Sequence, residues 1–172
     1  DFLLEGYETI LMKLLIGSVD GTVVASSQLI TVYDTSVPTY AVQATYQAIN
    51  EGSQVTFNIT TQGVPDDTVI YWTNNGTTSG ADFSSIIVPT GGTVDSSNMS
   101  GTVKINTNQA YVTMNVLNDL LLEGLETIVF NIHLGSIAAP NLTTPLIVNV
   151  YDTSVPTYSV STALASVNEG TT

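Results

Sequence analysis

Acidic side chains are the residues of this sequence that could do chemistry. The 172 residues include fifteen Asp and Glu against two lysines, which gives a net charge of −13. Glu123 and Glu126 stand three residues apart at the start of a predicted strand, where they could share one cation. The same pair could mimic the two carboxylates of a glycosidase. An alternative without any ligand is that both side chains cap a turn by accepting backbone N–H bonds.

The other residue types that enzymes use are nearly absent. The sequence has no cysteine, and His133 is its only histidine. Because His133 lies beside Ile132 and Leu134 in an alternating pattern, we expect a solvated strand residue rather than a general base. Nucleophile–base dyads and histidine-rich metal sites therefore have almost nothing to build on. The sequence predicts a protein that is not an enzyme.

The charge also limits the classes of partner. Nucleic acid needs Lys and Arg to displace its counterions, and anionic membrane surfaces attract basic segments, so neither is expected here. No apolar stretch is long enough to insert in a membrane. The acidic surface suits divalent cations, salty surroundings or simple solubility by mutual repulsion. Without disulfides, a packed core or a metal must supply the stability.

The pattern of side chains predicts strands throughout. β-Branched and aromatic residues alternate with Thr and Asn, which favours strands over helices. Trp72 lies on the third predicted strand, where sandwiches bury a core aromatic, and a hairpin is expected around residues 107–109. The expected strands are 40–49, 54–60, 68–73, 101–106, 111–117, 127–134 and 146–151. This is the pattern of an all-β, immunoglobulin-like antiparallel sandwich.

A long-period repeat is the strongest signal in the sequence. Residues 1–10 match residues 119–128 at eight positions, and residues 33–40 recur unchanged as 151–158. Every match is offset by 118 residues, and 23 of the 54 overlapping positions are identical. Repetition at a fixed period is the signature of a tandem array.

The repeat divides the chain into three parts. Residues 1–36 are expected to be the C-terminal half of a preceding repeat, residues 37–154 a complete repeat, and residues 155–172 the start of the next. The expected reason is that the chain is a window on a longer array. The alternative is that the two ends dock head to tail between subunits, as in donor-strand assembly.

Four motifs in order resemble the Calx-β domain. They are Asn-Glu-Gly at 50–52, Gly-Ala-Asp-Phe at 80–83, the run at 118–126, and Val-Asn-Val-Tyr-Asp at 148–152. The run at 118–126 resembles the acidic D-D-x-x-x-E-x-x-E element of the family. The Thr/Ser-rich style is also similar to repeats of very large bacterial surface proteins and of virion proteins of marine phages.

The family resemblance implies a weak calcium site at the junction with the next domain. Asn118 stands in place of a family Asp, and Thr153 and Ser154 stand where the family often has acids, so we expect affinities of about 10⁻⁴ to 10⁻³ M at best. The resemblance implies these ligands: Glu51, Asp82, Asn118, Asp119, the Leu121 carbonyl, Glu123, Glu126 and Asp152.

Together these features predict a non-catalytic structural repeat that acts as a rigid spacer or building block of a long extracellular or virion fibre. Its expected partners are neighbouring repeats of the same chain and like chains in a filament. The alternative is an adhesin that binds host-cell glycans or like chains. The divergent segments 19–30 and 137–148 are where such binding is expected. The expected location is extracellular, on a virion or a bacterial cell surface.

Overall fold

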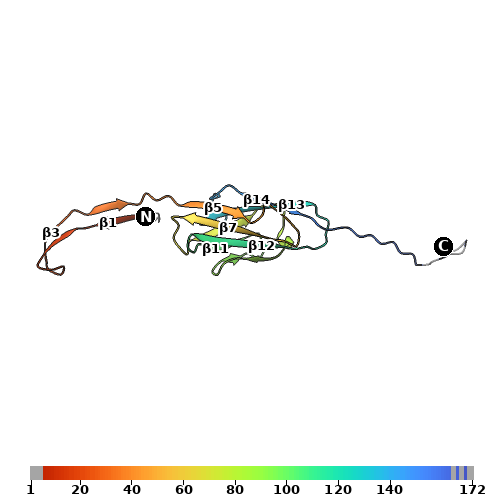
Figure 1. Cartoon of the computed structure of the whole chain (residues 1–172), viewed down its shortest axis with the longest axis horizontal. Helices are drawn as coiled ribbons and strands as arrows, with labels where there is room; N and C mark the ends of the chain where they lie inside the picture. The colour runs from red at the N-terminus through yellow and green to blue at the C-terminus, as the bar shows by residue number, and fades with distance from the viewer. Residues whose placement is uncertain (1–5, 164–165, 167–168, 170–172) are drawn as a thin grey trace.

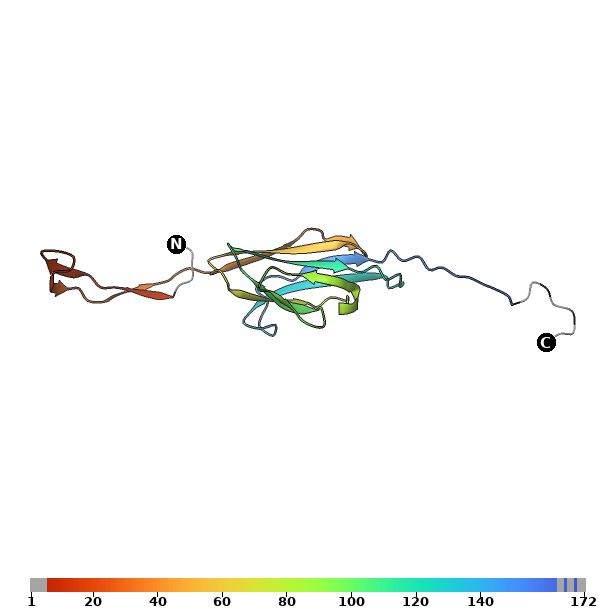
Figure 2. The same ribbon diagram turned by 90° about the horizontal axis from the view of Figure 1, so that it is seen from below.

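The chain forms a β-sandwich with a long two-stranded ribbon on one side and an extended tail on the other (Figures 1 and 2). This computed structural model describes residues 6–163, 166 and 169. No helix in these residues is long and apolar enough to cross a membrane.

One sheet of the sandwich has six strands in the order β10-β11-β8-β13-β14-β6. Neighbours are antiparallel, except that β14 and β6 run parallel. Its strands are β6 (Ala48–Asn50), β8 (Val69–Asn74), β10 (Thr93–Val94), β11 (Ser100–Lys104), β13 (Leu125–Leu134) and β14 (Leu146–Tyr151).

The other sheet has four antiparallel strands in the order β5-β7-β12-β9. Its strands are β5 (Thr39–Ala44), β7 (Gln54–Gln62), β9 (Phe83–Ile87) and β12 (Gln109–Val116). Alternate residues of β7 and β12 are buried, as expected when one face of a strand packs on a core.

Aromatic side chains join the two sheets. Phe57 from β7 stacks on Phe130 from β13, with ring centroids 4.2 Å apart and planes 5° from parallel. Trp72 from β8 lies against the same Phe130, with a centroid distance of 6.1 Å, and all three side chains are at most 1% exposed. The buried core residues all lie between Ile49 and Val150, so this unit carries its own core. The prediction of an all-β sandwich is confirmed.

Two predicted connections are wrong. The strand expected over 40–49 is two strands, because β5 pairs with β7 in one sheet while β6 pairs with β14 in the other. The hairpin expected around 107–109 does not form a two-stranded ladder. Its arms β11 and β12 belong to different sheets, and only Asn106 and Gln109 bridge them. In both cases the chain crosses between layers, which alternation along a strand cannot reveal.

The N-terminal ribbon repeats the β13–β14 pairing of the sandwich. It consists of β1 (Tyr7–Ile10), β2 (Lys13–Ile16), β3 (Thr22–Ser26) and β4 (Ile30–Tyr33), with β1 paired to β4 and β2 to β3. Tyr7 lies opposite Tyr33, and 118 residues later Leu125 lies opposite Tyr151. The two hairpins therefore share one register where β1 pairs with β4.

The ribbon exposes the side chains that its counterpart buries. Ile10, Met12 and Leu14 are 47%, 66% and 63% exposed. The residues 118 positions later belong to β13 and are at most 1% exposed, because the four-stranded sheet covers them. The ribbon thus has the apolar face of a sandwich strand without the opposing sheet.

Candidate functional site

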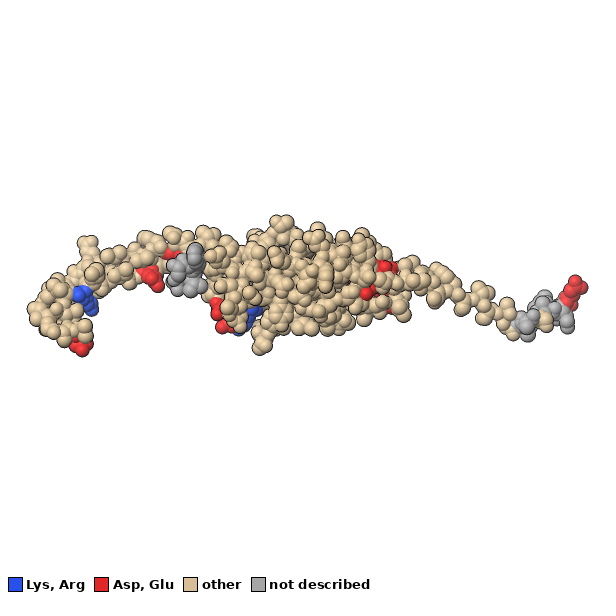
Figure 3. Space-filling view, viewed as in Figure 1, with Lys and Arg blue, Asp and Glu red and all other residues tan. Residues whose placement is uncertain are grey.

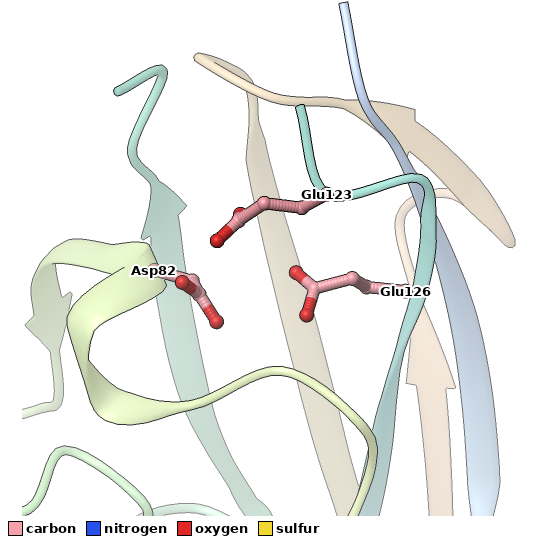
Figure 4. A group of neighbouring side chains, drawn as sticks. All are labelled: Asp82, Glu123 and Glu126. Atoms are coloured by element: carbon pink, nitrogen blue, oxygen red, sulfur yellow. The ribbon is translucent and has the colours of Figure 1, made fainter. Parts of the chain in front are cut away.

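Three carboxylates converge at the end of the sandwich where the chain leaves after β14. One oxygen from each of Asp82, Glu123 and Glu126 lies within 4.8 Å of the others. Figure 4 shows the three side chains pointing toward one another, Asp82 from one segment and Glu123 and Glu126 from another, and Figure 3 shows acidic residues gathered at this end of the sandwich. We call these three residues the acidic cluster.

Asp82 is positioned by a single 3-10 turn, η1 (Gly80–Asp82), which precedes β9. Ser79 caps the turn by accepting a hydrogen bond from the Ala81 N–H at 3.2 Å, and the Asp82 carboxylate accepts one from the Ser79 N–H in return. The Leu117 N–H donates to the Asp82 carbonyl at 2.7 Å, which ties the turn to the end of β12. This reciprocal capping box holds Asp82 in place.

Glu126 is positioned by β13. It pairs with Val150 and lies two residues before Ile128, so it points to the core side of the sheet, at the point where the core opens to solvent. Glu123 lies in the loop just before β13, next to Gly124, whose φ of +86° is favourable only for glycine.

Asp152 holds this loop against the end of β14. One of its oxygens accepts hydrogen bonds from the N–H groups of Glu123 and Gly124, at 2.8 and 3.1 Å. The other accepts one from the Ser154 N–H at 2.6 Å. These backbone bonds keep the pKa of Asp152 below its ordinary range. Asp34, 118 residues earlier, makes the same bonds to Gly6 and Ser36, at 3.3 and 2.7 Å.

The turn-cap alternative for Glu123 and Glu126 is therefore wrong. The backbone N–H groups of this loop donate to Asp152 and, from Leu121 at 2.9 Å, to Asp119. Within the residues that the structure describes, no hydrogen bond ends on the carboxylates of Glu123 or Glu126. These two carboxylates are left to face Asp82.

Desolvation and mutual repulsion make the acidic cluster hard to ionise fully. Desolvation raises the pKa of Glu126, and the carboxylates of Asp82, Glu123, Glu51 and Asp119 raise it further. Desolvation and a similar set of carboxylates, led by Asp119, also raise the pKa of Glu123. Like charges a few ångströms apart disfavour the charged state of each.

The spacing fits a calcium ion. Ca²⁺ binds carboxylate oxygens at 2.3–2.6 Å, so two ligands on opposite sides of one ion lie about 5 Å apart. The 4.8 Å limit within the acidic cluster falls inside that span. Three carboxylates supply only part of the six to eight oxygens that Ca²⁺ prefers, so the rest would come from bidentate binding, carbonyls or water.

The other predicted ligands lie around the cluster without joining it. Glu51 and Asp119 are near enough to raise the pKa of Glu126, while both oxygens of Asp152 already accept backbone bonds. The Asn118 amide donates to the Thr153 hydroxyl at 3.4 Å. Leu121 takes part through its N–H group, which donates a hydrogen bond to Asp119.

The pKa shift of Glu126 predicts how stability depends on pH. In the metal-free protein, Glu126→Gln is expected to raise the Tm at pH 7, because it removes a carboxylate that the fold disfavours. This gain should vanish below about pH 4.5, the ordinary pKa of a glutamate, since the native side chain is then neutral in both folded and unfolded states. Thermal unfolding from pH 4 to pH 8 measures it.

Asp95 provides a control of opposite sign. Partial burial raises its pKa, but hydrogen bonds from Ser97, Ser100 and Met99 outweigh this effect and keep the pKa below its ordinary value. Asp95→Asn should therefore lower the Tm at pH 7, and the loss should disappear as the pH falls through the folded pKa of Asp95. Equal Tm changes for both variants across the whole pH range would contradict this account.

His133 is buried, so the prediction of a solvated residue is wrong. It is 5% exposed, with Nδ1 2.7 Å from the Ala139 carbonyl oxygen and Nε2 3.2 Å from the Thr73 hydroxyl. Because a carbonyl only accepts, Nδ1 carries the proton. The segment after β13 folds back over the sheet, where the Asn141 amide donates to Asn131 at 3.0 Å. The first residues of the divergent segment 137–148 therefore pack over this sheet.

Compared with known proteins, the sequence matches no family model and no curated protein.

Proposed function

We propose that the chain is a non-catalytic structural repeat, each unit of which is a rigid spacer in a long extracellular or virion fibre. The observation that supports this most is the recurrence, at a spacing of 118 residues, of one hairpin register and one aspartate-held turn. A repeated sandwich with its own core adds length to a fibre without needing a partner.

The joint between units, residues 152–157, supports a stiff array. Pro156 fixes its own φ and pushes Val155 toward extended geometry. At the start of the joint, the Ser154 N–H bonds Asp152, and the Ser154 hydroxyl lies 3.5 Å from a Glu51 oxygen. Ser154, at the start of the joint, is thus bonded to the sandwich, which limits bending between units.

The exposed apolar face of the ribbon fits the same proposal. A four-stranded sheet of the kind formed by β5, β7, β12 and β9 would cover Ile10, Met12 and Leu14, as it covers their counterparts in β13.

We further propose that Ca²⁺ binds the acidic cluster and stiffens this end of each unit. With a dissociation constant of about 10⁻³ M, 10 mM Ca²⁺ should add about 1.4 kcal/mol to the free energy of unfolding. Glu126→Gln should lose most of this gain, whereas Asp95→Asn, outside the cluster, should keep it. Differential scanning calorimetry in calcium and in EDTA measures the effect. An unchanged Tm would mean that the acidic cluster does not bind Ca²⁺.

Immunogold electron microscopy tests the proposed role. An antibody raised against residues 37–154 is expected to label fibres or particle surfaces at regular intervals. Labelling along fibres of free particles would identify a virion component, and labelling of cell envelopes a surface protein. Label confined to a soluble fraction with no filament or particle would contradict the proposal.

A further inference from the structure

The loop at the acidic end of the sandwich exposes three consecutive leucines. Leu120, Leu121 and Leu122 are 79%, 57% and 68% exposed. A run of apolar residues that is fully open to water is unfavourable in a soluble domain and usually marks a contact surface. We call residues 120–122 the leucine loop.

The fold holds the leucine loop outward. Leu120 has a φ of +66°, a left-handed conformation that is rare for a residue with a branched side chain. Asp119 accepts a hydrogen bond from the Leu121 N–H, and Asp152 accepts hydrogen bonds from the N–H groups of Glu123 and Gly124, just after the loop. A strained backbone that is held in this way is often found at binding sites.

The apolar character of this loop occurs in both copies of the repeat. The sequence places Phe2, Leu3 and Leu4 at the equivalent positions. By contrast, residues 19–30 share no identical position with residues 137–148. The sequence of the loop thus stays apolar in both copies, while residues 19–30 and 137–148 differ at every position.

The joint brings the start of the next unit to this loop. Five residues, 153–157, lie between Asp152 and Tyr158, the counterpart of Tyr40 in β5, so Asp152 and Tyr158 are at most about 20 Å apart. In the described sandwich, the end at which the chain enters has two adjoining cavities of about 320 and 440 Å³. Residues Pro89, Lys104, Asn106 and Tyr111 line both cavities. We call these cavities the entry groove.

The entry groove offers a small apolar patch to the leucine loop. The Tyr111 side chain is 41% exposed and Pro89 lies beside it, while Asp66, Asp67 and Lys104 also line the groove. Thr60, also in the groove, pairs with Ala41 near the start of β5, which places the groove at the end that faces a preceding unit.

We infer that the leucine loop of each repeat docks into the entry groove of the following repeat and fixes the angle between them. This inference rests on the proposed tandem array and names the surfaces that make it stiff. Burial of the leucines against Tyr111 and Pro89 drives the contact, and the short joint makes it intramolecular, so a small interface is sufficient.

Spin–spin distances in a two-repeat protein test the inference. The protein carries two copies of residues 37–154 in succession, and Ser96→Cys in each copy provides an exposed label site in a chain without native cysteine. The distance distribution is expected to be narrow. The triple variant L120S/L121S/L122S in the first copy should widen it at least twofold, and so should Tyr111→Ser in the second copy.

The same substitutions in the opposite copies are the matched controls. L120S/L121S/L122S in the second copy, or Tyr111→Ser in the first, should leave the width unchanged because neither surface then faces a neighbour. Equal Tm values for the single-unit variants confirm that each one folds.

Three results would overturn the inference. One is a narrow distribution that the first-copy loop variant does not widen, which would leave the rigid spacer intact but without this contact. Another is a distribution that widens in the loop variant but not in the Tyr111→Ser variant, which would show that the loop does not dock into the entry groove. The third is loss of self-association between separate chains with no change in width, which would assign the loop to contacts between fibres. A broad distribution in the unsubstituted protein would instead contradict the rigid spacer itself.

Discussion

Replacing Phe130 with alanine is expected to lower the free energy of unfolding by about 4 kcal/mol. Phe130 is 1% exposed and stacks on both Phe57 and Trp72, so its removal opens a cavity where the two sheets meet. A closely packed core collapses only partly around such a cavity, and the stacking energy is lost as well. Urea unfolding followed by the fluorescence of Trp72, the only tryptophan, measures the change.

Ile147→Ala is the matched control for this core substitution. Ile147 lies on the neighbouring strand β14, but it is 54% exposed and faces away from the core. Its loss should cost less than about 1 kcal/mol, since little apolar surface returns to water. Similar losses for both variants would show that the sheets do not pack as described.

Gly101→Val is expected to lower the free energy of unfolding by about 3 kcal/mol, through overpacking. A Cβ at Gly101 would lie 2.0 Å from the Thr93 carbonyl oxygen and 2.9 Å from the Trp72 ring, with which Gly101 is paired across β11 and β8. Because the first of these atoms is backbone, β10 must move away from β11. Chemical denaturation gives the change in free energy of unfolding, and amide exchange at β10 reports the displacement.

Lys104→Ala on the same strand serves as the comparison. The Lys104 side chain is 40% exposed and forms one ion pair, with Asp67 at 3.3 Å. Exposed ion pairs contribute little, so the loss should be below about 1 kcal/mol. An equally stable Gly101→Val variant would mean that the Thr93 carbonyl and the Trp72 ring do not pack closely against this glycine.

Alternation along the chain was enough to predict which side chains of a strand face the core. In β7, Val55, Phe57 and Ile59 are buried, as the alternating pattern predicts, and Trp72 is a core residue. The pattern failed where the chain changes sheets, after Ala44 and after Lys104, because hydrophobic period says which face is buried but not which neighbour a strand pairs with.

The candidate site was only partly readable from sequence. Glu123 and Glu126 are close along the chain, but Asp82 is about forty residues away, and only its family-like motif suggested that it joins them. The role of Asp152 as the anchor of the loop was missed. Its signal was present, because the segment Asp-Thr-Ser recurs unchanged at 34–36 and 152–154, and Asp is typical of such side-chain-held turns.

His133 shows why burial of a polar strand residue is hard to predict. Its neighbours in sequence suggest an exposed face, and that face is covered by a segment that begins two residues later and folds back. The cover depends on hydrogen bonds from His133 and Asn141, so the polar residues are the ones that hold it.

Small-angle X-ray scattering of proteins with one, two and three copies of residues 37–154 tests whether these units are stiff spacers in a tandem array. If they are, each added copy lengthens the particle by the same step, while the radius of its cross-section stays constant. A smaller increase in maximum dimension with the third copy, or a larger cross-section, would show instead that the units fold onto one another or move freely.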